Sequence, residues 1–211
     1  ALISVPLLLR WLQLDVTTSM QAAFVLVLWV WLTGGLHLDG LADSADAWLG
    51  GFGDKQRTLD LMKDPTCGPS AVIVLVLVLL LKWLALSEVI AVIQLAPTWQ
   101  WLVLLVVPVL ARFEVMLLIV HTPYVRAEGL GTELKSQAQT HWVWFWCILL
   151  ALLMLYLNLW LSLVVLTTAT IGYGLMRRLM LQRIHGWTGD TAGASIEMTE
   201  LCLLLALSMA L

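Results

Sequence analysis

Residues 71–83 have the sequence AVIVLVLVLLLKW, and residues 142–160 have the sequence WVWFWCILLALLMLYLNLW. Such long apolar runs are unlike a core strand, and they lack the polar face of a surface helix. Of the 211 residues, 61% are hydrophobic and 12% are charged, whereas a soluble domain is about half apolar and a quarter charged. A bilayer core takes about 20 mostly apolar residues per helix, and a helix satisfies its own backbone hydrogen bonds. The sequence therefore predicts an all-α, polytopic integral membrane protein in a lipid bilayer.

Further apolar segments lie on both sides of these two runs and predict six to seven transmembrane helices in one domain over residues 1–211. No long linker or low-complexity tract divides them. The first segment is expected to be the end of a helix that starts before Ala1. The segments are expected at 1–12, 19–36, 69–94, 101–120, 142–157, 160–180 and 195–211.

The connections between the segments alternate between short and long. The long ones, residues 37–68, 121–141 and 177–194, hold eight of the eleven Lys and Arg residues, and the short ones hold none. Consecutive connections lie on opposite sides of a membrane, and basic residues favour the cytoplasmic side. All three long connections, and any active site on them, are therefore expected to face the cytoplasm.

Three aspartates, Asp39, Asp43 and Asp46, follow the second segment in GGLHLDGLADSAD, residues 34–46. On a helix they would share a stripe about 60° wide. Two charges about 5 Å apart repel by about 3 kcal/mol at an effective dielectric near 20, so protons or cations must neutralise the stripe. Oxygen ligands without a His/Cys cluster favour Mg²⁺, or Mn²⁺, over zinc. The alternative is a solvated acidic helix end, although the neighbouring residues are small or apolar.

A second carboxylate pair, Asp60 and Asp64, has the spacing of one helical face. The glycine-rich turn at residues 50–53 would let this pair fold back onto the first stripe. The alternative is an ordinary amphipathic surface helix, because Arg57 and Lys63 lie on the same stretch.

A third cluster lies in GWTGDTAGASIE, residues 186–197, where the last segment enters the membrane. Asp190 and Glu197 are seven residues apart and would share a helical face. The small residues between them would let another helix or a phosphate approach the backbone closely. The alternative is a role in helix packing alone.

Basic residues complement these acids. Arg112 lies inside an apolar segment, where an isolated charge is costly and usually functional. Arg126 begins the connection 121–141, and Lys82 and Glu88 are expected to pair with other helices in a structural role. Carboxylates that hold a divalent cation beside arginines suit a substrate with phosphates. A further basic group closes the sixth segment: Arg177, Arg178 and Arg183.

Other site classes find no support in the sequence. There is no P-loop or kinase glycine-rich motif, so ATP hydrolysis is not expected. The three cysteines, Cys67, Cys147 and Cys202, lack the spacing of a zinc site or a disulfide framework and are expected to pack as small apolar residues.

Together these motifs resemble the signature of the cobalamin synthase family, the adenosylcobinamide-GDP ribazoletransferases. The matching motifs occur in family order between residues 34 and 200. They are GLHLDGLADSAD at 35–46, Met62-Lys63-Asp64 with Gly68, Arg126 with EGLG at 128–131, and TGDTAGA at 188–194 with Glu197.

The resemblance implies a multi-pass, Mg²⁺-dependent enzyme of a bacterial or archaeal cytoplasmic (inner) membrane that acts in the last stage of vitamin B12 synthesis. Such an enzyme joins adenosylcobinamide-GDP to α-ribazole or its 5′-phosphate, and releases adenosylcobalamin or its 5′-phosphate with GMP. No nucleic-acid partner is expected, and a homo-oligomer is left open. The related CDP-alcohol phosphotransferases carry Ala-Arg after the first Asp-Gly, whereas here Ala42 is followed by Asp43.

On this interpretation the metal ligands are Asp39, Asp43, Asp46 and Asp64, and one of them or Asp190 acts as the base. Substrate contacts are expected from His37, Lys63, Arg112, Arg126, Glu128 and Glu197, with a packing role for His37 as the alternative. Two other functions stay open. A CDP-alcohol phosphotransferase acting on phospholipid would use the same chemistry, and a cation or proton transporter would place its carboxylates nearer the middle of the bilayer.

Overall fold

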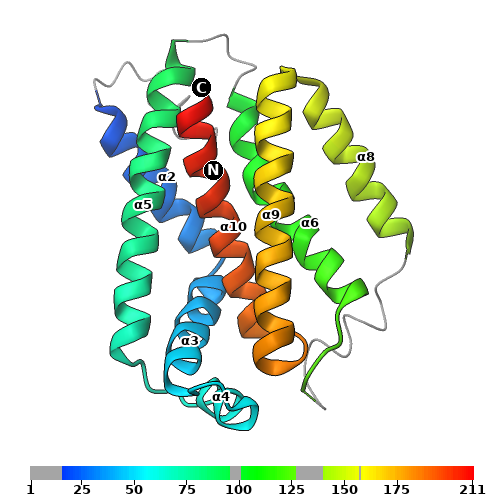
Figure 1. Ribbon diagram of the computed structural model, residues 1–211. Coiled ribbons are helices and arrows are strands. Elements are labelled where there is room, and N and C mark those ends of the chain that lie inside the picture. The colour runs from blue at the N-terminus through cyan, green and yellow to red at the C-terminus, as the bar shows by residue number, and fades with distance from the viewer. Residues whose placement is uncertain (1–15, 96–100, 127–139, 157) are drawn as a thin grey trace.

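The computed structural model describes residues 16–95, 101–126, 140–156 and 158–211, and in these ranges the chain is helical with no strand (Figure 1). Among the described residues, one bridge between extended residues pairs Tyr124 with Trp187. The all-α prediction is therefore confirmed. The helices are α2 (Thr18–Leu32), α3 (Leu36–Gly50), α4 (Lys55–Leu61), α5 (Pro69–Gln94), α6 (Val103–His121), α8 (Thr140–Tyr156), α9 (Leu159–Ile184) and α10 (Gly189–Ala210).

The membrane assignment is also supported by the helices themselves. Among the described residues α5, α6, α9 and α10 are long and apolar enough to cross a membrane, and α2 with α3 makes a fifth candidate span. α8 is apolar and has 17 residues, somewhat under the length that a bilayer core takes. The expected first segment, residues 1–12, lies outside the described residues.

The second span differs from its prediction. The sequence predicted one apolar segment over 19–36 followed by a polar connection, whereas α2 ends at Leu32 and α3 starts four residues later at an angle of 86°. Gly34 and Gly35 at the bend have φ values of +63° and +70°, which only glycine adopts without cost. The aspartate stripe therefore lies on a separate helix that follows this bend.

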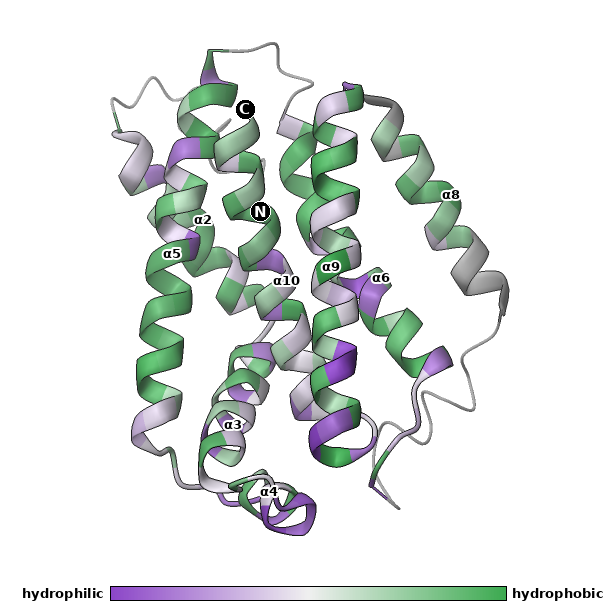
Figure 2. Cartoon of the chain, in the orientation of Figure 1, coloured by the Kyte–Doolittle hydropathy of each residue, from purple (hydrophilic) through white to green (hydrophobic). Residues whose placement is uncertain are grey.

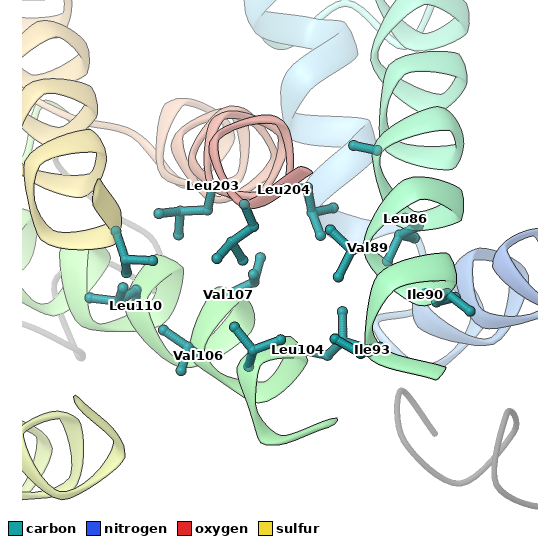
Figure 3. Close-up of a cluster of buried hydrophobic side chains, with 14 of the residues drawn as sticks. Leu86, Val89, Ile90, Ile93, Leu104, Val106, Val107, Leu110, Leu203 and Leu204 are labelled. Atoms are coloured by element: carbon teal, nitrogen blue, oxygen red, sulfur yellow. The ribbon is translucent and has the colours of Figure 1, made fainter. Parts of the chain in front are cut away.

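α10 lies at the centre of the bundle and contacts α3, α5, α6 and α9. In its most apolar stretch 67% of the residues are buried, against 22% in α9. Figure 3 shows the contact with its neighbours: Leu203 and Leu204 of α10 face apolar side chains of α5 and α6. Those partners include Leu86, Val89, Ile93, Leu104, Val107 and Leu110.

Lipid and water would cover different parts of the bundle. α5 exposes a row of large apolar side chains, from Val72 to Leu84, that suits contact with lipid. Hydrophilic residues concentrate at one end of the molecule, on α4 and at the adjoining ends of α6 and α9 (Figure 2). The described parts of all three long connections lie at this end, as the alternation of loops predicted (Figure 1).

One minor prediction was wrong. Cys67 does not pack as an apolar residue but is exposed, in the connection between α4 and α5, while Cys147 and Cys202 are partly buried.

Candidate active site

Helices α3 and α10 cross at glycines, and this crossing forms the candidate site. A Cβ atom on Gly40 would lie 2.6 Å from the carbonyl oxygen of Asp190, and one on Gly193 would lie 3.2 Å from the Cα of His37. Only residues without a side chain permit such an approach, as the small residues of 186–197 had predicted. The crossing brings the aspartates that flank Gly40 next to the first turn of α10.

Three carboxylates therefore meet from two helices. Asp43 is within electrostatic range of Asp39 on its own helix and of Asp190 on α10, with Arg126 as the nearby cation. Asp39 and Asp43 also line a cavity of about 290 Å³ that continues along residues 65–67 to the start of α5. Like charges gathered beside a cavity repel one another, which favours a bound cation or proton there.

Arg126 is placed by the chain that leaves α6. This chain runs beside the segment before α10: Val125 donates its N–H to the Trp187 carbonyl and Trp187 donates to that of Pro123, at 3.1 and 3.0 Å. The guanidinium then donates to Asp190 at 2.5 Å. Its Nε is buried with no acceptor in the described part of the chain, and such a donor is available for a substrate oxygen.

Asp46 has different surroundings from the other two members of the stripe. Its two carboxylate oxygens accept the backbone N–H groups of Gly68 and Ala71, at 2.6 and 2.9 Å. These groups belong to the start of α5, where unpaired N–H groups and the helix dipole favour a carboxylate. Asp46 thus caps α5 at the edge of the same cavity.

The second carboxylate pair is not on one helical face, contrary to the prediction. α4 ends at Leu61, because beyond it the Asp64 carboxylate accepts the N–H and hydroxyl of Thr66 and forms a turn. The Thr66 hydroxyl, and then its N–H, hold the pKa of Asp64 below its usual range. Asp60 and Asp64 line a separate surface cavity of about 620 Å³.

Deeper in the bundle, ionic side chains from four helices form a connected network. Lys82 of α5 donates to Glu197 at 2.6 Å and to Glu200 at 2.7 Å, both on α10. Arg112 of α6 donates to the other oxygen of Glu200. His37, the second residue of α3, lies 3.5 Å from Arg112 through its Nδ1 and 4.0 Å from Glu197.

This network is neutral when its His is neutral, since two cations face two carboxylates. Lys82 and Glu200 are almost fully buried, and a buried ion pair is tolerated only when each partner is matched. The expected pairing of Lys82 with another helix is confirmed, whereas Glu88 is exposed and makes no ion pair with any described residue. The predicted site residues His37, Arg112 and Glu197 lie together in this network. Glu197 follows Asp190 by seven residues, about two turns of α10, so the network is separate from the carboxylates at the crossing.

Comparison with known proteins gives the family. The family model for cobalamin-5-phosphate synthase matches residues 1–208. Adenosylcobinamide-GDP ribazoletransferase of Ectopseudomonas mendocina is 48% identical over 195 residues, which cover 91% of this chain and 76% of that protein. The protein of the same name from Pseudomonas syringae pv. syringae is 47% identical over 190 residues, 90% of this chain and 76% of the relative. The chain belongs to the cobalamin-5-phosphate synthase family. No solved structure matches it.

Within this family member, the structure divides the predicted site residues into groups. Asp39, Asp43, Asp190 and Arg126 surround the α3–α10 crossing, with Asp46 at the cavity edge. Lys63 and Asp64 are exposed on the segment after α4, and Glu128 lies outside the described residues.

Two buried acids were missed. Glu200 follows Glu197 by three residues in an apolar helix, a spacing that could have indicated a shared partner. Glu114 of α6 accepts the Thr199 hydroxyl at 2.6 Å, and nothing in the sequence singled it out.

A metal ion fits the chemistry of the cavity. No three His, Cys, Asp or Glu residues in the described ranges already form a set of metal ligands. Asp39 and Asp43 nevertheless offer oxygen donors alone, and the nearby Arg126 is already paired with Asp190. Oxygen donors with excess negative charge suit a hard divalent cation.

Proposed function

We propose that this chain is an adenosylcobinamide-GDP ribazoletransferase of the last steps of vitamin B12 synthesis. The observation that carries the proposal is the α3–α10 crossing in a member of this family. Asp39 and Asp43 line a cavity there, and Asp43 is within electrostatic range of Asp190 and Arg126. Carboxylates for a cation and an arginine for phosphate oxygens are what displacement at a diphosphate needs.

The proposed reaction is a single displacement at phosphorus. A hydroxyl oxygen of α-ribazole, or of its 5′-phosphate, bonds to the phosphorus that carries the cobinamide. The bond from that phosphorus to the bridging oxygen of the diphosphate breaks, and GMP leaves with the bonding electrons. The hydroxyl proton passes to one of the carboxylates Asp39, Asp43 or Asp190. The products are adenosylcobalamin, or its 5′-phosphate, and GMP.

The side chains have distinct proposed roles. Asp39 and Asp43, with Asp46 at the edge, would hold Mg²⁺ or Mn²⁺, which when bound neutralises charge on the diphosphate. Arg126 would contact a phosphate oxygen through its unpaired Nε, while Asp190 fixes the orientation of the guanidinium. Lys63 and Asp64 would reach the substrate from the segment after α4. The deeper network with His37 and Arg112 would hold α10 against α3.

The proposal is tested with purified chain in nanodiscs, supplied with adenosylcobinamide-GDP, α-ribazole and MgCl₂. Chromatography should detect a cobalamin and GMP in equal amounts, with no product in excess EDTA and weak activity with Ca²⁺, whose bonds are longer and looser. Full activity in EDTA would remove the metal from the reaction. A monodisperse protein that makes no cobalamin, but releases CMP from a CDP-alcohol in the presence of an alcohol acceptor, would overturn the assignment.

A cytoplasmic site is part of the proposal. The described parts of the three long connections lie at one end of the bundle, and these connections hold most of the basic residues in the sequence, which favours the cytoplasmic face of an inner membrane.

A further inference from the structure

A third cavity lies away from the α3–α10 crossing, between the ends of α6 and α9. It has a volume of about 350 Å³ and is lined by Leu117, His121, Tyr173 and Arg177. Figure 1 shows the end of α6 diverging from α9 at the end of the bundle where the long connections gather. Figure 2 shows that the end of α9 is hydrophilic, and Arg177 lies seven residues before Ile184, the last residue of α9. The cavity therefore lies near the boundary between the apolar bundle and its polar end.

Arg177 is held rigidly in this cavity by neutral groups. Its Nε donates to the Thr122 hydroxyl at 3.1 Å, and one Nη donates to the His121 carbonyl at 3.1 Å. A guanidinium has five N–H donors, so these two bonds fix its plane and leave the others available.

The charge of Arg177 is not matched by a carboxylate in the part of the chain that the structure describes. Arg112, Arg126 and Lys82 each pair with an Asp or Glu there, whereas Arg177 does not. A half-buried cation beside apolar helices is costly unless an anion accompanies it. The cavity therefore favours an anionic ligand.

The other lining groups indicate which anion fits. The planar guanidinium matches two phosphate oxygens at once. The Tyr173 side chain lies one turn before Arg177 on the same face of α9 and carries a hydroxyl donor. The Nδ1 of His121 lies 3.0 Å from the Leu117 carbonyl and donates to it, so the neutral ring adds a wall to the cavity but no donor for the anion. Leu117 supplies an apolar wall for whatever carries the anion.

We propose that this cavity is a binding site for a phosphate group, anchored by Arg177 and distinct from the site at the α3–α10 crossing. Basic pockets between membrane helices at the cytoplasmic boundary bind anionic lipid headgroups, and a soluble phosphate would offer the same oxygens. The inference does not depend on the proposed transferase activity.

The test compares two arginines of equal charge that lie one residue apart. Arg177→Gln removes the anchor, whereas Arg178→Gln removes an exposed arginine that is not among the lining residues. Lipid-free protein in a neutral detergent is titrated with fluorescent phosphatidylglycerol, with phosphatidylcholine as the reference, and separately with inorganic phosphate in a thermal-shift assay. Loss of the Arg177 guanidinium should weaken binding at least about 10-fold in Arg177→Gln. Binding should weaken less than about 2-fold in Arg178→Gln.

Each result decides the proposal. Phosphatidylglycerol binding that depends on Arg177 and is displaced by phosphate supports it, with lipid as the source. Phosphate binding that depends on Arg177, without lipid binding, supports it with a soluble source. If Arg177→Gln lowers thermal stability but binds both ligands as wild type does, Arg177 only holds the end of α6 and the proposal is overturned.

Two milder variants test the same site if the Arg177→Gln protein does not fold. Tyr173→Phe keeps the ring and should weaken binding about 3-fold through loss of one hydrogen bond. Arg177→Lys keeps the charge but loses the planar guanidinium, so its affinity should lie between those of wild type and Arg177→Gln. Unchanged binding in both would overturn the proposal.

Discussion

Asp43 and Asp46 lie three residues apart on α3, yet their carboxylates have different surroundings. Asp46 accepts two backbone N–H groups at the start of α5, whereas Asp43 faces Asp39 and Asp190. Helical spacing alone predicted that the stripe shares one face. It could not reveal which member caps another helix, because that depends on where residues 65–71 return to α3.

The different surroundings predict different effects for two equivalent substitutions. Asp43→Asn keeps the size of the side chain but removes a charge that would bind the cation. Turnover should then fall at least about 10²-fold, or roughly 2.7 kcal/mol of transition-state stabilisation, with little change in melting temperature. Asp46→Asn places an amide against two N–H donors at the helix start, so its melting temperature should fall.

Steady-state turnover and melting temperature are measured on the same preparations of wild type, Asp43→Asn and Asp46→Asn. Wild-type turnover of Asp43→Asn at saturating Mg²⁺ would show that Asp43 is not a ligand.

Lys82 is the residue whose loss should most disturb the folded bundle. Lys82→Met keeps the apolar length of the side chain but leaves Glu197 and Glu200 to share Arg112. Breaking a buried pair from one side costs about 3–5 kcal/mol, because the remaining charge is uncompensated. We expect a large fall in melting temperature in nanodiscs.

Charge balance can be restored within the same network. Lys82→Met combined with Glu197→Gln again leaves one cation and one carboxylate, so part of the lost stability should return. Arg178→Gln, which removes an exposed arginine near the polar end of α9, serves as the control and should be near neutral. Equal stability of the single and double variants would argue against the network as a stabilising unit.

At the scale of elements, the crossing of α3 and α10 depends on Gly40 and Gly193, and both lie in motifs that the sequence analysis had identified. The sequence predicted close approach by another helix but could not identify α3 as that helix. The break between α2 and α3 was missed because glycine is frequent in membrane helices, so Gly34 and Gly35 did not by themselves predict a break.

The crossing predicts that alanine is harmful at Gly40 but tolerated at Gly172, where an added methyl group meets open space. A methyl group on Gly40 would lie 2.6 Å from the Asp190 carbonyl oxygen, so the helices must separate. Gly40→Ala should cost about 1–3 kcal/mol of stability and more activity than stability, since Asp190 moves with α10.

Gly172→Ala on α9 is the matched control for this experiment. Nothing lies within 4 Å of its added methyl group, and alanine favours the helix by about 1 kcal/mol. The melting temperature should therefore fall for Gly40→Ala and rise for Gly172→Ala. Turnover should fall only for Gly40→Ala. Equal effects would show that the close contact at Gly40 does not restrict the bundle.

At the scale of the whole molecule, loop length and charge predicted that the three long connections share one end. That pattern is visible in the sequence because it follows from composition along the chain. The deep network was only partly predictable, since Glu200 becomes meaningful only when α10 is known to be the central helix.

The cytoplasmic placement of that end is a separate, testable prediction. The exposed native Cys67 lies in the first long connection and can report it directly. An impermeant thiol reagent should leave Cys67 unlabelled in intact cells and label it after permeabilisation. Single cysteines at Gln56, Gln137 and Gln182 in a cysteine-free background should behave alike. Labelling of any of these positions from outside the cell would contradict the topology.

The central position of α10 also has a consequence for how the chain is made. Ribosomes synthesise α5 and α6 before α10, so Lys82 and Arg112 enter the membrane before Glu197 and Glu200 exist. A lysine at the centre of a helix opposes insertion by about 2.5–3.5 kcal/mol, which the apolar remainder of α5 must outweigh. Nascent chains therefore carry unpaired cations until α10 arrives, and a ribosome that stalls earlier would release a fragment recognisable to membrane quality-control proteases by that exposed charge.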